Sequence, residues 1–160
     1  MATAYGTISQ ICVAYLNFDD FASTPQDHSS QDGFTQQDKG YNLVDYAALH
    51  WVAHYTSQPS ESAKDARKAA QNLCDTSLPQ KSYWFKIYCE STYLKGFDGW
   101  TGLGIASLFG LEYVVEGFLH EGAGLNAQAG GSSNALQAAS SVGHDQVLQI
   151  LLDKGAHINA

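Results

Sequence analysis

Apolar residues in the first part of the chain recur at helical spacing. Ile8, Ile11, Cys12 and Leu16 are three or four residues apart or adjacent, and Leu43–His54 repeats this pattern in the run LVDYAALHWVAH. Residues three and four apart share one face of an α-helix, so each stretch predicts a helix with one buried side.

Two further helices are expected before the middle of the chain. Ala63–Leu73 has the spacing of a helix, and Ser60 or Ser62 is placed to cap its N-terminus. The aromatic segment Tyr83–Tyr93 (YWFKIYCESTY) is interpreted as a fourth helix. A strand is the alternative there, since aromatic residues favour both structures.

The segment Ser23–Gly40 separates the first two predicted helices. It is rich in Gln, Asp and Ser and nearly devoid of aliphatic residues. Such a composition cannot bury enough apolar surface to order itself, so we expect a long mobile loop, residues 23–40, without an assigned function.

The last third of the chain contains an internal repeat. Thr101–Ala127 and Asn134–Ala160 align at a spacing of 33 residues. A fixed period of this length predicts stacked repeats, which present surfaces to partners and seldom carry chemistry. The identical pairs are Leu103/Leu136, Ala106/Ala139, Ser107/Ser140, Gly110/Gly143, Val114/Val147, Leu119/Leu152, Gly122/Gly155, Ala123/Ala156, Asn126/Asn159 and Ala127/Ala160.

Each repeat is predicted to form a short helix, a glycine break, a longer helix and an extended finger. In the second repeat the predicted helices are Ala135–Val142 and Asp145–Asp153, with the break at Gly143. Gly155 stands where a left-handed residue would end the longer helix. The corresponding positions of the first repeat are Gly110, Glu112 and Gly122.

These residues resemble the ankyrin repeat, whose pattern runs from TPLHxAA through GH and VVxxLL to GADVNA. The resemblance implies an all-α fold, in which an irregular helical N-terminal segment (residues 1–95) packs on a two-repeat ankyrin stack, an α-solenoid (about 96–128 and 129–160). The framework residues that it implies are Leu103, Ala106, Gly110, Gly122, Asn126, Leu136, Ala139, Gly143, Gly155 and Asn159.

Both repeats depart from the family pattern. Asn134 and Gln137 replace the usual Thr and His, and we expect their side chains still to bond across the turn. Gly102 and Gly104 replace Pro and His in the first repeat. The first repeat is therefore expected to be the looser of the two.

The N-terminal zone also resembles a known segment. ICVAYLNFDDFAS followed by YNLVDYAALHWVAHY is similar to the helices that precede ankyrin arrays in fungal NACHT-containing, NLR-like (STAND) proteins. The NTPase of those proteins has no counterpart here, because no GxxxxGK[ST] motif occurs in the sequence. We therefore expect no nucleotide or other cofactor.

The charge balance narrows the range of partners. The 160 residues include 8 Lys and Arg against 16 Asp and Glu, a formal net charge of −8. Such a chain is a poor match for nucleic acid or for an anionic membrane surface. The N-terminus lacks a basic region and a cleavage site of the secretory type, and no apolar run is long enough to span a bilayer.

Three cysteines, Cys12, Cys74 and Cys89, are widely spaced and form no CxxC pair. An odd number of cysteines without metal-binding spacing favours reduced thiols and a cytoplasmic location. Nothing near them suggests a nucleophile, so no catalytic residue is predicted.

His50 and His54 stand four residues apart on one predicted helix face. Two histidines at this spacing can bind zinc, which would suggest a small metal-dependent hydrolase. The metalloprotease motif requires Glu after the first histidine, where this chain has Trp51. The favoured interpretation is that the histidines flank a buried tryptophan.

The candidate partner-binding residues come from the ankyrin alignment. Finger tips and the ends of the short helices line the partner-facing side in that family. The alternative is that the aromatic residues among them pack under the N-terminal helices, because two repeats cannot bury their core unaided. The candidates are Phe97, Asp98, Trp100, Leu108, Phe109, Ser133, Ser141 and Val142.

Together these features predict a non-catalytic protein–protein interaction module, a fragment or truncated relative of a fungal NLR-like sensor. A purely structural connector within a longer ankyrin array is the alternative. Leu148, Leu151 and Leu152 are expected to face an absent neighbouring repeat. We therefore expect self-association, or fraying of Asp145–Ala160.

Overall fold

The computed structural model describes residues 4–17, 43–77, 83–92, 99–128 and 134–157. The regular secondary structure of these parts is helical, apart from one isolated antiparallel bridge between Gln128 and Asn134. The all-α fold class is therefore confirmed for the described residues, whereas the loop predicted at 23–40 lies outside them. The helices are α1 (Ala4–Leu16), α2 (Leu43–Thr56), α3 (Ser60–Asp65), α4 (Arg67–Cys74), α5 (Tyr83–Thr92), α6 (Gly102–Leu108), α7 (Glu112–His120), α8 (Ala135–Val142) and α9 (Asp145–Asp153).

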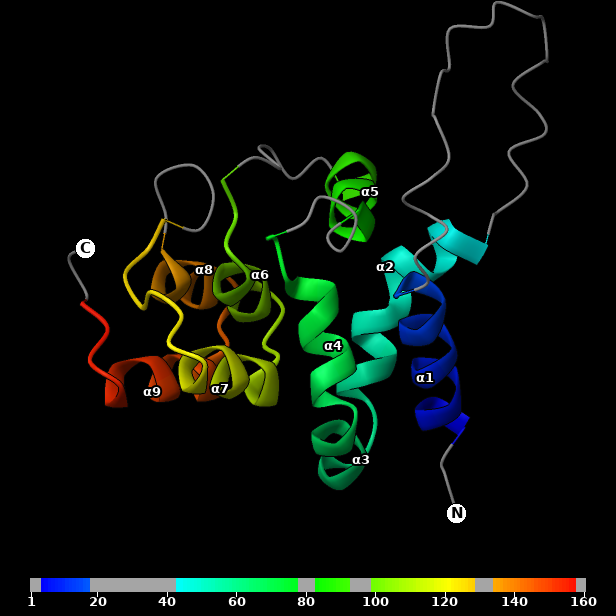
Figure 1. Cartoon of the computed structure of the whole chain (residues 1–160), viewed down its shortest axis with the longest axis horizontal. Helices are drawn as coiled ribbons and strands as arrows, with labels where there is room; N and C mark the ends of the chain where they lie inside the picture. Colours follow the sequence, from blue (N-terminus) through cyan, green and yellow to red (C-terminus); the bar gives the residue numbers. More distant parts are fainter. Residues whose placement is uncertain (1–3, 18–42, 78–82, 93–98, 129–133, 158–160) are drawn as a thin grey trace, which may run out of the picture.

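Helices α1 and α2 pack side by side at one end of the molecule (Figure 1). Cys12 and Val13 of α1 are buried, as are Ala47 and Trp51 of α2. Small residues on α2 allow a close helix–helix approach, while Trp51 fills the space toward α5, which also contacts α2.

The predicted helix at 63–73 is two helices. Its start was also wrong: neither Ser60 nor Ser62 is the N-cap, because α3 begins at Ser60 and Pro59 precedes it without a side-chain cap. Ala66 ends α3 and begins α4 with φ −79° and ψ −3°, which bends the chain between them. Its N–H bonds to the carbonyls of Ser62 and Lys64, so the backbone remains paired at the bend.

The aromatic segment is helical, as predicted: α5 covers Tyr83–Thr92. Trp84, Phe85 and Cys89 are its buried residues, and they recur at the spacing of one helix face. A strand would have sent Trp84 and Phe85 to opposite sides of a sheet, whereas the helix buries both.

The C-terminal part consists of two stacked helix pairs, α6–α7 and α8–α9 (Figure 1). The short helix α8 packs on α6, and the longer α9 packs on α7. Within each pair the helices also contact each other, so the four form two layers. This arrangement confirms the helix–turn–helix repeat that the period of 33 residues predicts.

The second repeat has the helix ends expected from its sequence. Asn134 Oδ1 accepts a hydrogen bond from Gln137 N at 2.9 Å, and Gln137 Oε1 accepts one from Asn134 N at 3.1 Å. This reciprocal pair is a capping box, so the two departures from the family pattern still close the first turn. Gly143 and Gly155 both have positive φ, where a side chain would be strained.

Two contacts fix the second repeat against the first. His144 Nε2 lies 3.1 Å from the carbonyl oxygen of Leu108, and the imidazole covers Gly110 so closely that a Cβ there would lie 2.6 Å from Nδ1. Asn126 Oδ1 accepts a hydrogen bond from the backbone N–H of His157 at 3.0 Å. The stack is thus held by specific polar contacts as well as by apolar packing.

Helix α4 contacts α6 and α7 on the side opposite the second repeat. Gln71 is 3% exposed, and its Nε2 donates to Glu121 Oε2 at 2.7 Å, while Lys68 Nζ donates to Glu121 Oε1 at 2.7 Å. The hydrogen bond from Lys68 is the main cause that lowers the pKa of the Glu121 carboxyl. Helix α4 therefore occupies the position where a preceding repeat would stack.

Gly102 has a packing role at this junction. A Cβ at Gly102 would lie 2.7 Å from the carbonyl oxygen of Cys74 and 2.6 Å from Cζ of Phe118. The glycine that replaces the usual proline therefore lets the end of α4 approach α6. Residues Leu103–Ser107, which follow it, are all buried.

We expect Gly102→Ala to lower the free energy of unfolding by about 1–3 kcal/mol, because a backbone carbonyl cannot turn away as a side chain can. Urea denaturation followed by circular dichroism measures this loss. Gly124→Ala is the matched control: its Cβ would meet Ala127 Cβ at an ordinary 3.4 Å. Equal stability of the two variants would show that the α4–α6 junction can accommodate an added methyl group without loss.

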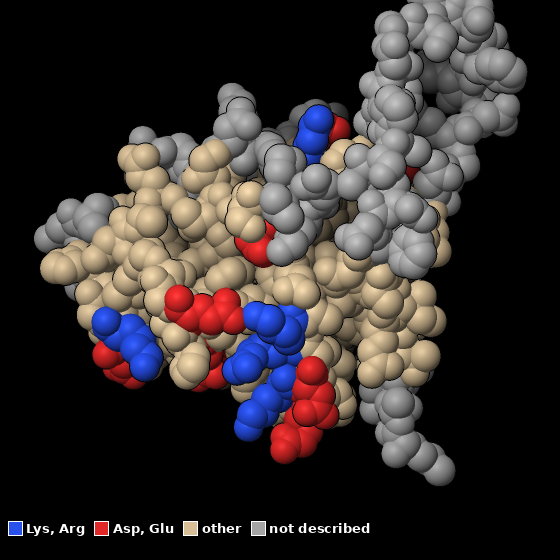
Figure 2. All heavy atoms as spheres, in the orientation of Figure 1, with Lys and Arg blue, Asp and Glu red and all other residues tan. Residues whose placement is uncertain are grey.

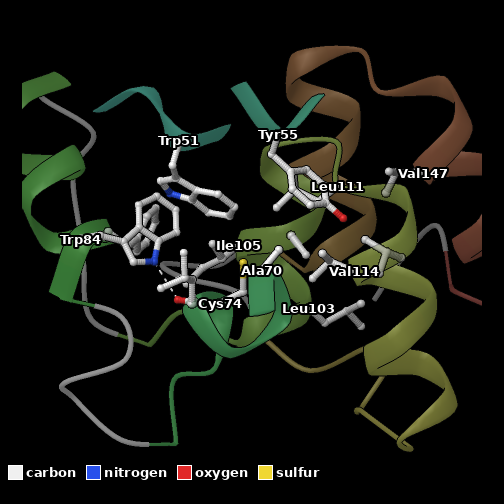
Figure 3. Packing of buried hydrophobic residues seen from close by; sticks show 14 of the residues in the cluster. Trp51, Tyr55, Ala70, Cys74, Trp84, Leu103, Ile105, Leu111, Val114 and Val147 are labelled. Carbon is white, nitrogen blue, oxygen red and sulfur yellow. Dashed lines mark hydrogen bonds between the residues drawn. The ribbon is translucent and has the colours of Figure 1, made fainter. Parts of the chain in front are cut away.

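One hydrophobic cluster extends from α1 to α9. At its centre Trp51 and Trp84 meet edge to face, with ring centroids 4.9 Å apart and an interplanar angle of 87° (Figure 3). Trp84 Nε1 donates a 2.7 Å hydrogen bond to the carbonyl oxygen of Leu73, which ties α5 to α4. The N-terminal helices and the repeats therefore share a single core.

Helix α9 differs from the sequence expectation in one respect. Leu151 was expected to face an absent neighbour, but its side chain is fully buried, together with Val147. The helix turns this face toward α7 and α8, both of which contact it. Leu148 is half-buried and Leu152 is 41% exposed, so Leu152 is the apolar residue that α9 presents to solvent.

Candidate protein-interaction surface

The short helices α6 and α8 lie in one layer and are the elements that carry the predicted partner-binding residues. Phe97, Asp98 and Ser133 lie outside the described residues. The structure places the remaining five at the start of α6, at its C-terminal end and at the C-terminal end of α8. These are Trp100, Leu108, Phe109, Ser141 and Val142.

The aromatic candidates of the first repeat contact α5. Phe109 lies 4.9 Å from Tyr88 and 5.6 Å from Trp84 between ring centroids, and Trp100 lies 5.4 Å from Phe85. Trp100 and Phe109 are nevertheless only half-buried. One part of each ring thus stabilises the fold, and the rest remains accessible.

Helix α8 presents the more open part of the surface. Gln137, Ser140 and Ser141 are exposed, and Val142 is 55% exposed. The buried side of the same helix consists of small residues and one leucine, so a rigid base supports the exposed side. Val142 is an apolar side chain without cover at the end of a capped helix.

Helix α5 contributes Tyr88 to the candidate surface, and the sequence did not predict this residue there. Tyr88 is half-buried and packs edge to face on Phe109, at an interplanar angle of 84°. It therefore extends the surface from the repeats onto the N-terminal segment. The repeat alignment could not indicate this, because Tyr88 lies before the first repeat.

Charge is distributed unevenly over the molecule. Helices α6 and α8 contain no Asp, Glu, Lys or Arg. On the face shown in Figure 2, most charged side chains gather along the lower edge, over α3, α4, α7 and α9. Recognition by α6 and α8 would therefore depend on shape and apolar contact more than on charge.

The chemistry of the cysteines does not favour nucleophilic catalysis. Cys12, Cys74 and Cys89 are all buried. Burial disfavours the thiolate and raises the pKa of each thiol, to about 11 for Cys89. A thiol with such a pKa is almost wholly protonated at neutral pH.

His50 and His54 both contact Tyr46 on α2. The ring centroids of Tyr46 and His50 are 4.7 Å apart, and His54 Nε2 lies 2.9 Å from the Tyr46 hydroxyl oxygen. Trp51, between the two histidines in sequence, is fully buried. Among the described residues, no His, Cys, Asp or Glu completes a group of three metal ligands.

None of the described helices combines the length and the hydropathy needed to cross a membrane.

Comparison with known proteins supports the ankyrin interpretation of the second repeat. The family model of the ankyrin repeat matches residues 133–160, which hold α8 and α9. A curated relative is the azaphilone pigments biosynthesis cluster protein L of Monascus ruber, 33% identical over 168 residues. The alignment covers 94% of this chain but only 34% of the relative, so the chain spans about a third of that protein's length.

No solved structure matches the chain. The assignment therefore rests on the family match and on the geometry of the helix pairs. The α6–α7 pair repeats the order, the glycine positions and the packing of the matched α8–α9 pair. Residues 133–160 thus match the model of an ankyrin repeat, and the α6–α7 pair before them has the same order of helices.

Proposed function

We propose that this chain is a non-catalytic module that recognises a protein partner through the exposed side of α8 and the half-buried Trp100, Leu108 and Phe109 at the two ends of α6. Ankyrin repeats bind protein partners, and the observation that supports the site most strongly is the 55% exposed Val142. It lies beside exposed polar residues on a helix whose other side is buried. A preformed surface of this kind loses little conformational entropy on binding.

The comparison with the curated relative also bears on the proposed NLR-like sensor. The relative is named for a pigment biosynthesis cluster, so that name does not support an NLR-like sensor. The sensor assignment rests on the resemblance of the N-terminal segment alone. A structural connector within a longer chain is the alternative, and the relative's greater length is consistent with it.

Affinity capture from an extract of the native host tests the proposal. We expect the chain to recover a protein that Val142→Asp recovers at least about tenfold less, because a carboxylate placed in an apolar contact must be desolvated. Leu152→Asp is the matched control, since it introduces the same charge at an exposed apolar residue of α9.

Circular dichroism should show both variants folded. Equal recovery by the two variants, or no specific protein with the unaltered chain, would contradict the proposed surface and favour the structural connector. Sedimentation of the same samples reports on self-association. If α9 pairs two copies, Leu152→Asp dissociates them and Val142→Asp does not.

A further inference from the structure

A groove lies between the end of α2 and the two helix–helix turns of the repeats. Its larger part, about 320 Å³, is bounded by Tyr55, Gln58, Glu112 and Tyr113, among others. An adjoining part of about 240 Å³ continues past His144. Thr56, Gly110, Glu112 and Gln146 line both parts, so the two parts adjoin and are together called the groove.

Gln58 is an unusual member of this lining. The side chain is only 7% exposed, and neither its Oε1 nor its Nε2 has a hydrogen-bond partner among the described residues. Buried amides are almost always paired, because an unpaired one loses the hydrogen bonds that it makes to water. Both atoms are themselves shielded from solvent, so a ligand in the groove reaches them only when the side chain turns outward. A ligand group that both donates and accepts would then satisfy the amide.

A peptide bond is such a group. Its carbonyl accepts from Nε2 and its N–H donates to Oε1, so one peptide unit satisfies both atoms of Gln58. No hydrogen bond of the Gln58 side chain has to break when that side chain turns toward the ligand.

The charge of the groove selects the ligand further. Glu112 is the one Asp, Glu, Lys or Arg among the residues that line the two parts. It is half-buried at the start of α7, and no lysine or arginine lines the groove beside it. The positive N-terminal end of α7 offsets part of the carboxylate's charge, but no lysine or arginine of the lining competes with a cationic side chain of the ligand for it.

We propose that this groove binds an extended peptide segment of a partner protein that carries an arginine. Gln58 pairs with the peptide backbone, and Glu112 pairs with the guanidinium group. Arginine fits better than lysine because its planar group forms two parallel hydrogen bonds to a carboxylate. Val142 lines neither part of the groove, although Phe109 of the candidate surface lines the smaller part.

Nuclear magnetic resonance titration of the full chain with acetyl-Gly-Arg-Gly-amide tests this site. We expect shifts at amides around Gln58, Glu112 and Gln146. The same peptide with citrulline, which keeps the shape of arginine but has no charge, should bind about tenfold more weakly. Equal affinity for the two peptides, or no saturable binding of the arginine peptide, would overturn the proposal.

Two variants test the separate roles of Glu112 and Gln58 in peptide binding. Glu112→Gln should abolish the preference for arginine over citrulline, whereas Glu116→Gln, an exposed glutamate on the same helix and outside the groove, should keep it. Gln58→Leu should weaken binding of both peptides and leave the chain as stable as before or more so, since it removes a buried unpaired amide.

A Gln58→Leu variant that loses stability while peptide binding stays unchanged would show that Gln58 stabilises the fold. It would contradict a role of Gln58 in peptide binding. Val142→Asp should leave the peptide titration unaltered. The failure of either site is thus distinguishable from the failure of the other.

Discussion

Trp84→Ala is expected to lower the free energy of unfolding by about 3–5 kcal/mol. Trp84 is 1% exposed and contacts Trp51, Phe85 and Phe109 through ring pairs. Its removal would leave a cavity where α2, α5 and α6 meet. It would also leave the carbonyl of Leu73 without the hydrogen bond from the indole, which adds to the loss.

Chemical denaturation measured by far-ultraviolet circular dichroism gives this value. The free energy of unfolding of a small domain is roughly 5–15 kcal/mol, so the variant should be close to unfolding at 37 °C. Trp84→Phe is the control: it keeps an aromatic ring and loses the N–H group, and its loss should be intermediate. A Trp84→Ala variant within about 1 kcal/mol of the unaltered chain would contradict the shared core.

Leu151→Ala should cost about 2–5 kcal/mol, whereas Leu152→Ala should cost less than about 1 kcal/mol. The two leucines are adjacent on α9 but differ in environment: Leu151 is fully buried and Leu152 is 41% exposed. Both substitutions remove the same atoms and have the same effect on helix propensity. The difference between them therefore isolates the burial of one side chain.

Urea denaturation of the two variants and the unaltered chain provides the comparison. Equal losses would mean that α9 is not docked on α7 and α8 in solution. A larger loss for Leu152 would mean that Leu152, and not Leu151, packs against α7 and α8 in solution.

The second repeat was predictable almost to the residue, because its signals are local. The capping residues Asn134 and Gln137 and the glycines at 143 and 155 act within one turn of the helix ends that they define. A period of 33 residues then extended the same boundaries to the first repeat. Local chemistry of this kind does not depend on the rest of the fold.

The features that were predicted wrongly or not predicted at all depend on contacts between distant segments. The orientation of Leu151 is set by α7 and α8, and the role of Gly102 is set by the carbonyl of Cys74 on α4. Repeat periodicity places neither contact. Similarly, the bend at Ala66 has no proline or glycine to mark it.

The candidate surface was predictable in part for the same reason. The repeat alignment indicated Val142, which is exposed, but it could not show that Tyr88 of α5 packs on Phe109. The groove beside Gln58 was not foreseen at all. It forms only where the end of α2 meets two turns that are more than thirty residues apart in sequence, Gly110 and His144.

The N-terminal helices and the repeats share one core, so we expect them to fold as one unit that holds the candidate surface rigid. Native-state hydrogen exchange of Trp84→Ala measures whether they do. We predict that the buried amides of α6 and α8 lose protection together with those of α2 and α5, by about a hundredfold or more. Loss confined to α2 and α5, with protection of α6–α9 unchanged, would show two independent units and contradict the claim.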